Sequence, residues 1–133
     1  MTVSYDNAAD RWVMSFLGGG AQLAISDGPD PVNDGWTVYT YGSVNDYQKV
    51  SVWHDGYYLT ANKSGEVVYV LERDVILNGG EDPQIVGFSP PGLVFNPGTV
   101  KSLATSNMLG SDYPENSPGY IRAKKILKLY LIQ

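Results

Sequence analysis

The chain has 133 residues, no cysteine, a charged fraction of 17% and a formal net charge of −5. The length suits one domain, and the frequent glycine and tyrosine are typical of strands joined by tight turns. The lack of cysteine excludes disulfides and thiolate chemistry, and the acidic balance argues against a nucleic-acid partner, which needs clustered Lys and Arg.

Alternating apolar residues predict a hairpin near the N-terminus. Trp12, Met14 and Phe16 share one face of a strand, residues 18–20 break it, and residues 22–26 return as its partner. A loop rich in Pro and Asp, residues 27–35, then leads to a strand over 36–41. The first ten residues contain neither a basic start nor an apolar run, so neither a signal peptide nor a membrane span is predicted.

The clearest hairpin lies in the middle of the chain. Residues 49–54 alternate, the pair Asp55-Gly56 is among those favoured in two-residue turns, and residues 57–62 form the partner strand. Residues 66–71 are apolar enough for a strand buried on both faces. These three strands form a predicted meander.

The C-terminal half is predicted to hold more loop. One helical turn over 73–78 and a strand over 84–89 come first, and residues 92–95 are a further candidate strand. Residues 96–119 form a long loop with little periodicity. The chain closes in a hairpin of 120–122 and 126–132, whose basic residues we interpret as a solvated face or as a contact for an acidic partner surface. These residues are Arg122, Lys124, Lys125 and Lys128.

An internal repeat indicates the fold. The segments 10–12 and 55–57 each open a strand that is followed by a glycine turn and a second apolar strand. The offset of about 45 residues is the length of a four-stranded propeller blade. The sequence therefore predicts one all-β domain, 1–133, of antiparallel four-stranded meanders resembling β-propeller blades. The approximate units are 10–45 and 46–95, followed by a loop-rich part, 96–133.

The number of strands predicts an incomplete ring in one chain. About ten strands make roughly two and a half blades, whereas a closed ring needs at least four. We therefore expect a fragment of a longer ring, a ring completed by self-association, or a different compact sandwich or barrel.

The run DYQKVSVWHDGYYLTAN, residues 46–62, resembles a D-Y-P-K-x-x-V-W-x-D-G-Y-Y-x-T-x-N pattern of large secreted bacterial proteins of β-propeller type. A D-P…W-x-x-Y segment precedes that pattern and is similar to residues 30–39. Gln48 stands where the pattern has Pro, and the spacing from Pro31 to Trp36 is one residue longer. The resemblance covers about residues 5–92. It implies a propeller-type fold and a secreted or cell-surface location, and it transfers no functional residue.

Candidate ligand-binding residues cluster around the central hairpin. If the strand that ends at Trp53 is innermost in its blade, its first residues approach the central axis, where propellers commonly bind ligands. The only histidine, His54, stands beside Asp55, but nothing places a nucleophile near it. The candidate set is Asp46, Tyr47, Lys49, Trp53 and His54.

One loop offers weak metal ligands. Asp27, Asp30 and Asp34 lie close together with Asn33, and calcium binds clustered oxygen donors, although the spacing is not that of an EF-hand. The alternative is that these residues form turns beside Gly and Pro.

The predicted function is a non-catalytic binding or structural module of an exported bacterial protein. Three Trp and ten Tyr residues suit a carbohydrate or protein ligand, although aromatic residues also dominate the cores of small sheets. The alternative is a glycoside-hydrolase or sialidase-like propeller fragment whose carboxylates are completed by other blades or subunits. The partner is expected to be a second copy or the remainder of a longer propeller.

Overall fold

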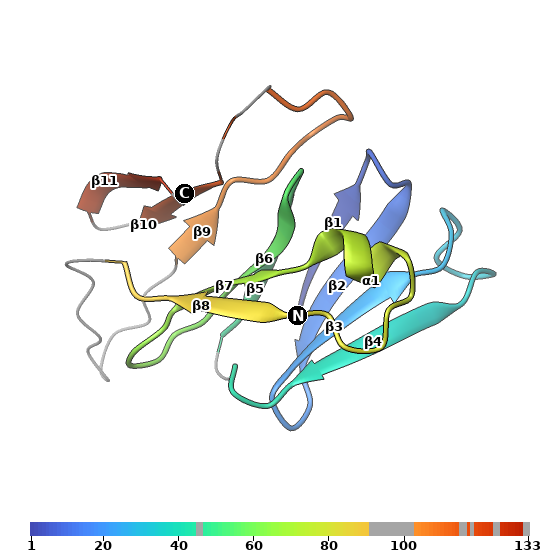
Figure 1. The fold of residues 1–133 in the computed structure, drawn as a ribbon, viewed down its shortest axis with the longest axis horizontal. Coiled ribbons are helices and arrows are strands. Elements are labelled where there is room, and N and C mark those ends of the chain that lie inside the picture. Colours follow the sequence, from blue (N-terminus) through green and yellow to red (C-terminus); the bar gives the residue numbers. More distant parts are fainter. Residues whose placement is uncertain (45–46, 91–102, 115–116, 118, 124–125, 132–133) are drawn as a thin grey trace.

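The structure is a computed structural model that describes residues 1–44, 47–90, 103–114, 117, 119–123 and 126–131 (Figure 1). Strands dominate these residues, and the only helix among them is α1, Arg73–Leu77. The strands are β1 (Thr2–Asp6), β2 (Arg11–Leu17), β3 (Ala21–Ser26), β4 (Trp36–Tyr41), β5 (Lys49–Trp53), β6 (Gly56–Thr60), β7 (Val68–Leu71), β8 (Ile85–Phe88), β9 (Leu103–Thr105), β10 (Tyr120–Ala123) and β11 (Ile126–Leu131).

The strands form three antiparallel sheets. The first sheet has the order β1-β2-β3-β4, the second β5-β6-β7-β8, and the third β11-β10-β9. Two four-stranded meanders follow one another along the chain, as the alternation predicted. The propeller-type ring, incomplete in one chain, stays a prediction.

The repeat seen in the sequence corresponds to equivalent strands. Asp10 and Arg11 open β2, and Asp55 and Gly56 open β6, about 45 residues later. In both sheets the strands run in chain order from one edge to the other. Equivalent residues can therefore be compared between the two sheets, for example Trp12 with Tyr57.

The three sheets stack in the order of the chain, and their first strands lie together. β5 contacts both β1 and β9. The main chain of this edge strand is bonded to its neighbours: Val50 N donates to Thr2 Oγ1 (3.0 Å), and Val52 N donates to Asn107 Oδ1 (2.8 Å). Because an edge strand otherwise leaves such groups unpaired, these contacts fix β5 between the other two sheets.

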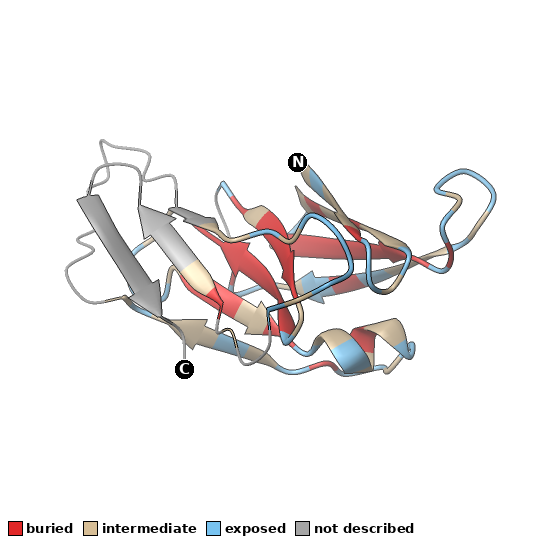
Figure 2. Cartoon of the chain, turned by 90° about the horizontal axis from the view of Figure 1, so that it is seen from above, coloured by how far each residue is buried: buried red, intermediate tan, exposed pale blue. Residues whose placement is uncertain are grey.

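The main core lies between the first and second sheets (Figure 2). α1 covers one end of this core through Ile76, and the Tyr39 hydroxyl donates to the carbonyl of Gly80 beyond that helix (3.0 Å). The buried members come from both sheets and include Val13, Leu23, Ile25, Tyr39, Val50, Val52, Tyr57, Leu59, Tyr69 and Leu71.

A second core lies on the opposite face of the second sheet. Trp53, Tyr58 and Val68 pack there with Met108 and Tyr120, which come from the region of the third sheet. The second sheet is therefore covered on both faces, which confirms the prediction that residues 66–71 include a strand buried on both faces.

Several predicted details are corrected. Trp53 pairs with Gly56, so the turn consists of His54 and Asp55, and Gly56 belongs to the strand. A Cβ atom at Gly56 would lie 2.6 Å from Val70 Cγ1, so close packing explains this glycine. β1 was not predicted, and β9 lies within the predicted loop 96–119. The candidate strand over 92–95 lies outside the described residues.

The helical turn after β7 ends as its sequence predicted. α1 is followed by Gly79 in the left-handed region, with φ of 70°. No helix in the described part of the chain is long and apolar enough to cross a membrane.

Candidate functional site

The surface of the first sheet that points away from the second sheet is apolar, and we call it the free face. Strand pairing places Val3, Met14, Ala24 and Val38 in one row across the four strands. Val3 and Val38 are each 50% exposed. The free face consists of Val3, Tyr5, Trp12, Met14, Phe16, Ala24, Trp36 and Val38, together with the polar residues Gln22, Ser26 and Thr40 in the same rows.

The polar atoms of the free face are already bonded within the chain. Trp12 Nε1 donates to the carbonyl of Pro29 (3.0 Å), Trp36 Nε1 donates to that of Pro31 (3.2 Å), and the Tyr5 hydroxyl donates to Asp10. The Tyr5 and Trp12 rings pack with centroids 4.8 Å apart. The rings are therefore held in place on the sheet and remain partly exposed.

The predicted ligand-binding residues do not gather at one place. Asp46 lies outside the described residues. Tyr47 is exposed, has a left-handed backbone with φ of 50°, and its ring lies 5.3 Å from Lys49 Nζ at the start of β5. Trp53 and His54 lie at the opposite end of that strand. The four described residues of this set therefore do not line a single site.

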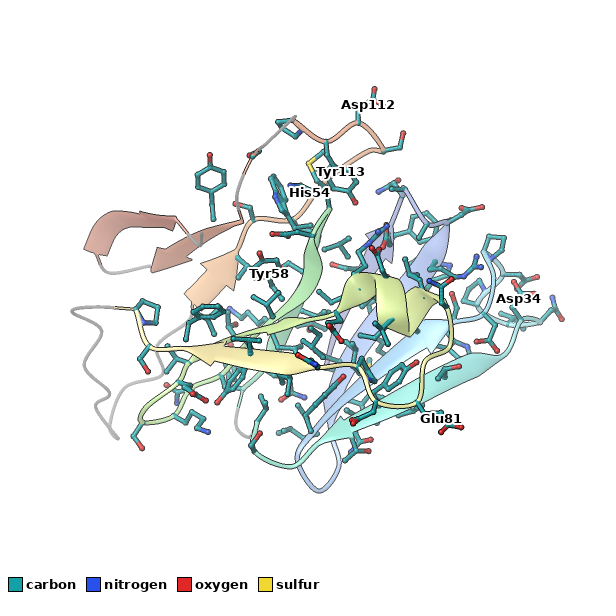
Figure 3. All side chains as sticks on the ribbon, viewed as in Figure 1. Asp34, His54, Tyr58, Glu81, Asp112 and Tyr113 are labelled. Carbon is teal, nitrogen blue, oxygen red and sulfur yellow. The ribbon has the colours of Figure 1, made fainter. Side chains whose placement is uncertain are left out.

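Trp53 and His54 belong instead to an aromatic cluster at the contact with the third sheet. Trp53 Nε1 donates to the carbonyl of Ser117 (3.0 Å), and His54 Nε2 lies 2.7 Å from the same oxygen. The His54 and Tyr113 rings pack edge to face at 5.5 Å (Figure 3), and Tyr120 packs on Trp53. These contacts hold the segment before β10 against the β5–β6 turn.

A buried polar cluster joins the first two sheets. Asp6, fully buried at the end of β1, pairs with Arg73 through Nε to Oδ2 (2.7 Å) and Nη2 to Oδ1 (2.9 Å). The Tyr57 hydroxyl and the backbone N–H of Ala9 also donate to this carboxylate. Four donors offset the cost of burying the Asp6 carboxylate. This cluster therefore links the two sheets, and the carboxylate is not free for proton transfer.

Burial and the charges of this cluster shift the pKa values of Tyr57 and Arg73. Burial raises the pKa of Tyr57, and Asp6 raises it further. Burial lowers the pKa of Arg73, but the hydrogen bonds and charge of Asp6 outweigh this, and the pKa is raised. The cluster was not predicted, because its members stand far apart in the sequence, at positions 6, 57 and 73.

The carboxylates of the loop 27–35 are engaged in holding its turns. Asp30 accepts from Val32 N, Asn33 N and Asn33 Nδ2, and these bonds, led by the side chain of Asn33, lower the pKa of Asp30. Asp34 Oδ2 accepts from Asp30 N (2.8 Å), and Asp27 Oδ1 accepts from Thr37. Within the described residues, no group of three or more His, Cys, Asp or Glu side chains could hold a metal ion.

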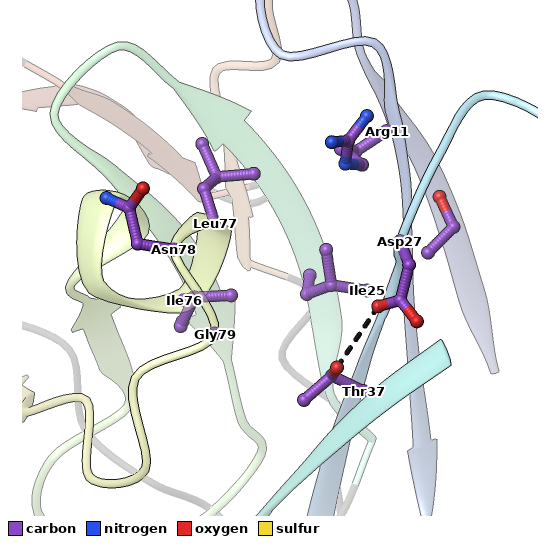
Figure 4. A pocket seen from close by; sticks show the side chains of 9 residues that line it. Arg11, Ile25, Asp27, Thr37, Ile76, Leu77, Asn78 and Gly79 are labelled. Atoms are coloured by element: carbon purple, nitrogen blue, oxygen red, sulfur yellow. Dashed lines mark hydrogen bonds between the residues drawn. The ribbon is translucent and has the colours of Figure 1, made fainter. Parts of the chain in front are cut away.

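A cleft of about 260 Å³ lies between the first sheet and α1 (Figure 4). It is smaller than the roughly 300–1,000 Å³ of pockets for drug-sized ligands. Its walls combine a guanidinium, a carboxylate, a hydroxyl and an amide with aliphatic side chains, a mixture that suits a small polar molecule. The residues that line the cleft include Arg11, Ile25, Asp27, Thr37, Ile76 and Asn78.

No protein-family model matches the chain, and no curated protein and no solved structure matches it. The resemblance of residues 46–62 to secreted bacterial β-propeller proteins therefore stays a prediction.

Proposed function

We propose that this chain is a non-catalytic structural and binding module of an exported bacterial protein, and that it assembles with a second copy of itself through the free face. The observation that carries the proposal is an apolar row across the four strands, Val3, Met14, Ala24 and Val38, whose two ends, Val3 and Val38, are half exposed. The resemblance of residues 46–62 to secreted bacterial proteins supports export.

The free face has the composition of a protein interface. Tyr, Trp, Phe and Met are the residues enriched at such surfaces, and an aromatic side chain buries about 150–250 Å². The four aromatic rings of the free face are already partly buried in the chain, so each adds only its remaining exposed area, together with the half-exposed Val3 and Val38, to the roughly 800 Å² per partner that a stable interface buries. The indole N–H groups are already bonded to the loop, so covering the rings leaves no buried donor unpaired.

The described groups best suited to proton transfer are occupied, which supports a non-catalytic role. His54 contacts a backbone carbonyl, and Asp6 is paired with Arg73. The rival proposal, a glycoside hydrolase completed by other blades, requires turnover of chromogenic glycosides that is lost when a carboxylate is replaced.

Sedimentation velocity over a range of concentrations tests the assembly. The wild-type chain is expected to associate, and Val38→Lys to abolish association by placing a charge in the free face. Val86→Lys is the matched control, because Val86 is 51% exposed on β8, the equivalent outer strand of the second sheet. A wild-type chain that stays monomeric at all concentrations would overturn the proposal.

The cleft supports a second candidate function, the binding of a monosaccharide-sized ligand. Isothermal titration with a panel of monosaccharides measures this directly. Thr37→Val, which removes a hydroxyl from the cleft, should weaken binding, whereas Thr40→Val on the same strand should not, because Thr40 bonds Gln22 on the other face. Equal binding by both variants would exclude the cleft as the sugar site.

A further inference from the structure

We infer that the cleft between the first sheet and α1 binds a zwitterionic α-amino acid with an aliphatic side chain. Arg11 binds the carboxylate of this ligand, and Asp27 and Thr37 bind its ammonium group. The inference rests on the cleft holding a small polar molecule, as in the second candidate function, but it names a different chemical class for that molecule. It is independent of assembly through the free face.

The first step is a guanidinium with two unused donors. Arg11 alternates with the buried Val13 along β2, so it lies on the core side of the first sheet. Its Nη1 donates to the carbonyls of Ala9 (3.4 Å) and Asp10 (3.1 Å), which holds the guanidinium in position. Among the described residues, Arg11 has no ion-pair partner, and its Nε and Nη2 groups have no acceptor. Two adjacent N–H groups of a guanidinium match the two oxygens of a carboxylate.

The ion pair in the core shows the same recognition within this chain. Nε of Arg73 donates to Oδ2 of Asp6 (2.7 Å), and Nη2 donates to Oδ1 (2.9 Å). Arg11 lines the cleft with these two donor groups unpaired. It is therefore equipped to bind a carboxylate that a ligand supplies.

The second step is the opposite charge on the neighbouring strand. Asp27 follows directly after β3, and its Oδ1 accepts from the Thr37 hydroxyl (3.1 Å), whose oxygen can still accept from a ligand (Figure 4). Asp27 and Arg11 line the same cleft without forming an ion pair. A cleft with one charge of each sign is complementary to a ligand that carries both. Since neighbouring strands lie about 4.8 Å apart, these charges suit the adjacent ammonium and carboxylate groups of an α-amino acid.

The third step is the size of the cleft and the nature of its remaining wall. Ile25 lies on the sheet side, and Ile76 and Leu77 lie on the helix side (Figure 4). At about 30 Å³ for each molecule of liquid water, the volume of about 260 Å³ has room for about nine non-hydrogen atoms. Leucine has about this number, and its side chain has no polar group that needs a partner beside the aliphatic wall.

Isothermal titration with L-leucine and three other ligands tests the chemical class. N-acetylleucine lacks the ammonium group, leucinamide lacks the carboxylate, and glucose lacks both charges. Leucine is expected to bind at least about tenfold more tightly than each of the others, because each of them loses at least one charge-assisted contact.

Two substitutions assign each charge of the ligand to a residue. Arg11→Gln should weaken leucine binding at least about tenfold and leave leucinamide binding unchanged, since leucinamide has no carboxylate. Asp27→Asn keeps an oxygen for the Thr37 hydroxyl and should weaken leucine binding by a similar factor, but leave N-acetylleucine binding unchanged. Far-ultraviolet circular dichroism like that of wild type shows that each variant is folded.

The matched control removes a negative charge close to the cleft but outside it. The Asp74 side chain on α1 is 89% exposed and does not line the cleft. Asp74→Asn should therefore bind leucine like wild type, whereas a loss equal to that of Asp27→Asn would show a general charge effect and contradict the assigned contact.

The remaining outcomes separate the ligand class from the cleft itself. Leucine binding that is unaffected by Arg11→Gln and Asp27→Asn overturns the inference. Binding of glucose without binding of leucine also overturns it, and the second candidate function then stands. If neither leucine nor any monosaccharide binds, both are overturned, and assembly through the free face is unaffected.

Discussion

The first and second sheets have the same strand order, yet they differ in what covers them. The second sheet lies between two cores, and Tyr57 and Tyr58 on adjacent positions of β6 are both buried, one on each face. In the first sheet only Val13 of the equivalent pair is buried, whereas Trp12 is partly exposed. Equivalent strands therefore differ in burial because the second sheet has a packed neighbour on each face, whereas the first sheet has one on a single face among the described residues.

The largest expected effect is alkaline unfolding, which breaks the cores on both sides of the second sheet. Burial raises the pKa of Tyr39, Tyr41, Tyr57 and Tyr58 above the unfolded value near 10. Above pH 10 the unfolded chain loses these protons first, so the free energy of unfolding falls as the pH rises. Each buried tyrosine contributes a fall of about 1.4 kcal/mol per pH unit.

Urea titrations at a series of pH values measure this loss, and absorbance near 295 nm follows tyrosinate formation. Below pH 10 the contribution of these tyrosines should be constant. If Tyr→Phe at one of these four positions removes absorbance that forms while the fold is intact, the burial of that side chain is contradicted.

The next largest effect on stability is expected at the Asp6–Arg73 ion pair, which links the first and second sheets. Asp6→Asn leaves Arg73 partly buried beside a neutral partner, which is expected to lower the free energy of unfolding by about 3–5 kcal/mol. The control is Asp6→Leu combined with Arg73→Met, which removes both charges and should cost less than the single substitution. Guanidinium unfolding measures both. A single substitution that costs less than about 1 kcal/mol would show that the pair does not join the sheets.

A matched pair of truncations compares the covered and free faces directly. Leu59→Ala should cost about 2–5 kcal/mol, because Leu59 is fully buried against the first sheet. Its equivalent in the first sheet is Met14, on the free face, and Met14→Ala should cost about 1 kcal/mol or less in dilute monomer. Thermal unfolding at low concentration measures this difference. Equal costs would mean that the free face is already covered.

Much of the fold could be predicted from the sequence because its pattern is local. Alternation and glycine turns gave β2 to β4, the central hairpin and the closing hairpin, and the repeat gave their grouping into meanders. β1 and β9 were missed. The segment Thr2–Asp6 alternates but has only two apolar residues, Val3 and Tyr5, and β9 has only three residues, so both patterns are too short to stand out in the sequence.

The site was harder to predict because it depends on contacts between distant residues. Trp53 and His54 were chosen for their chemistry, but their partners Tyr113 and Ser117 come from a segment predicted only as loop. Which face would be free could not be read from Trp36–Tyr41, since that strand has aromatic residues on both faces.

The last prediction compares how the hydroxyl groups of Tyr57 and Tyr113 contribute to the free energy of unfolding. The Tyr57 hydroxyl donates to the Asp6 carboxylate, so Tyr57→Phe should cost about 1.5–3 kcal/mol. The Tyr113 hydroxyl is buried and has no hydrogen-bond partner among the described residues. Tyr113→Phe removes an unsatisfied group and should leave stability unchanged or raise it by up to about 1 kcal/mol. If Tyr113→Phe is as destabilising as Tyr57→Phe, the Tyr113 hydroxyl has a partner, and the segment before β10 is attached to the polar cluster as well as to the aromatic one.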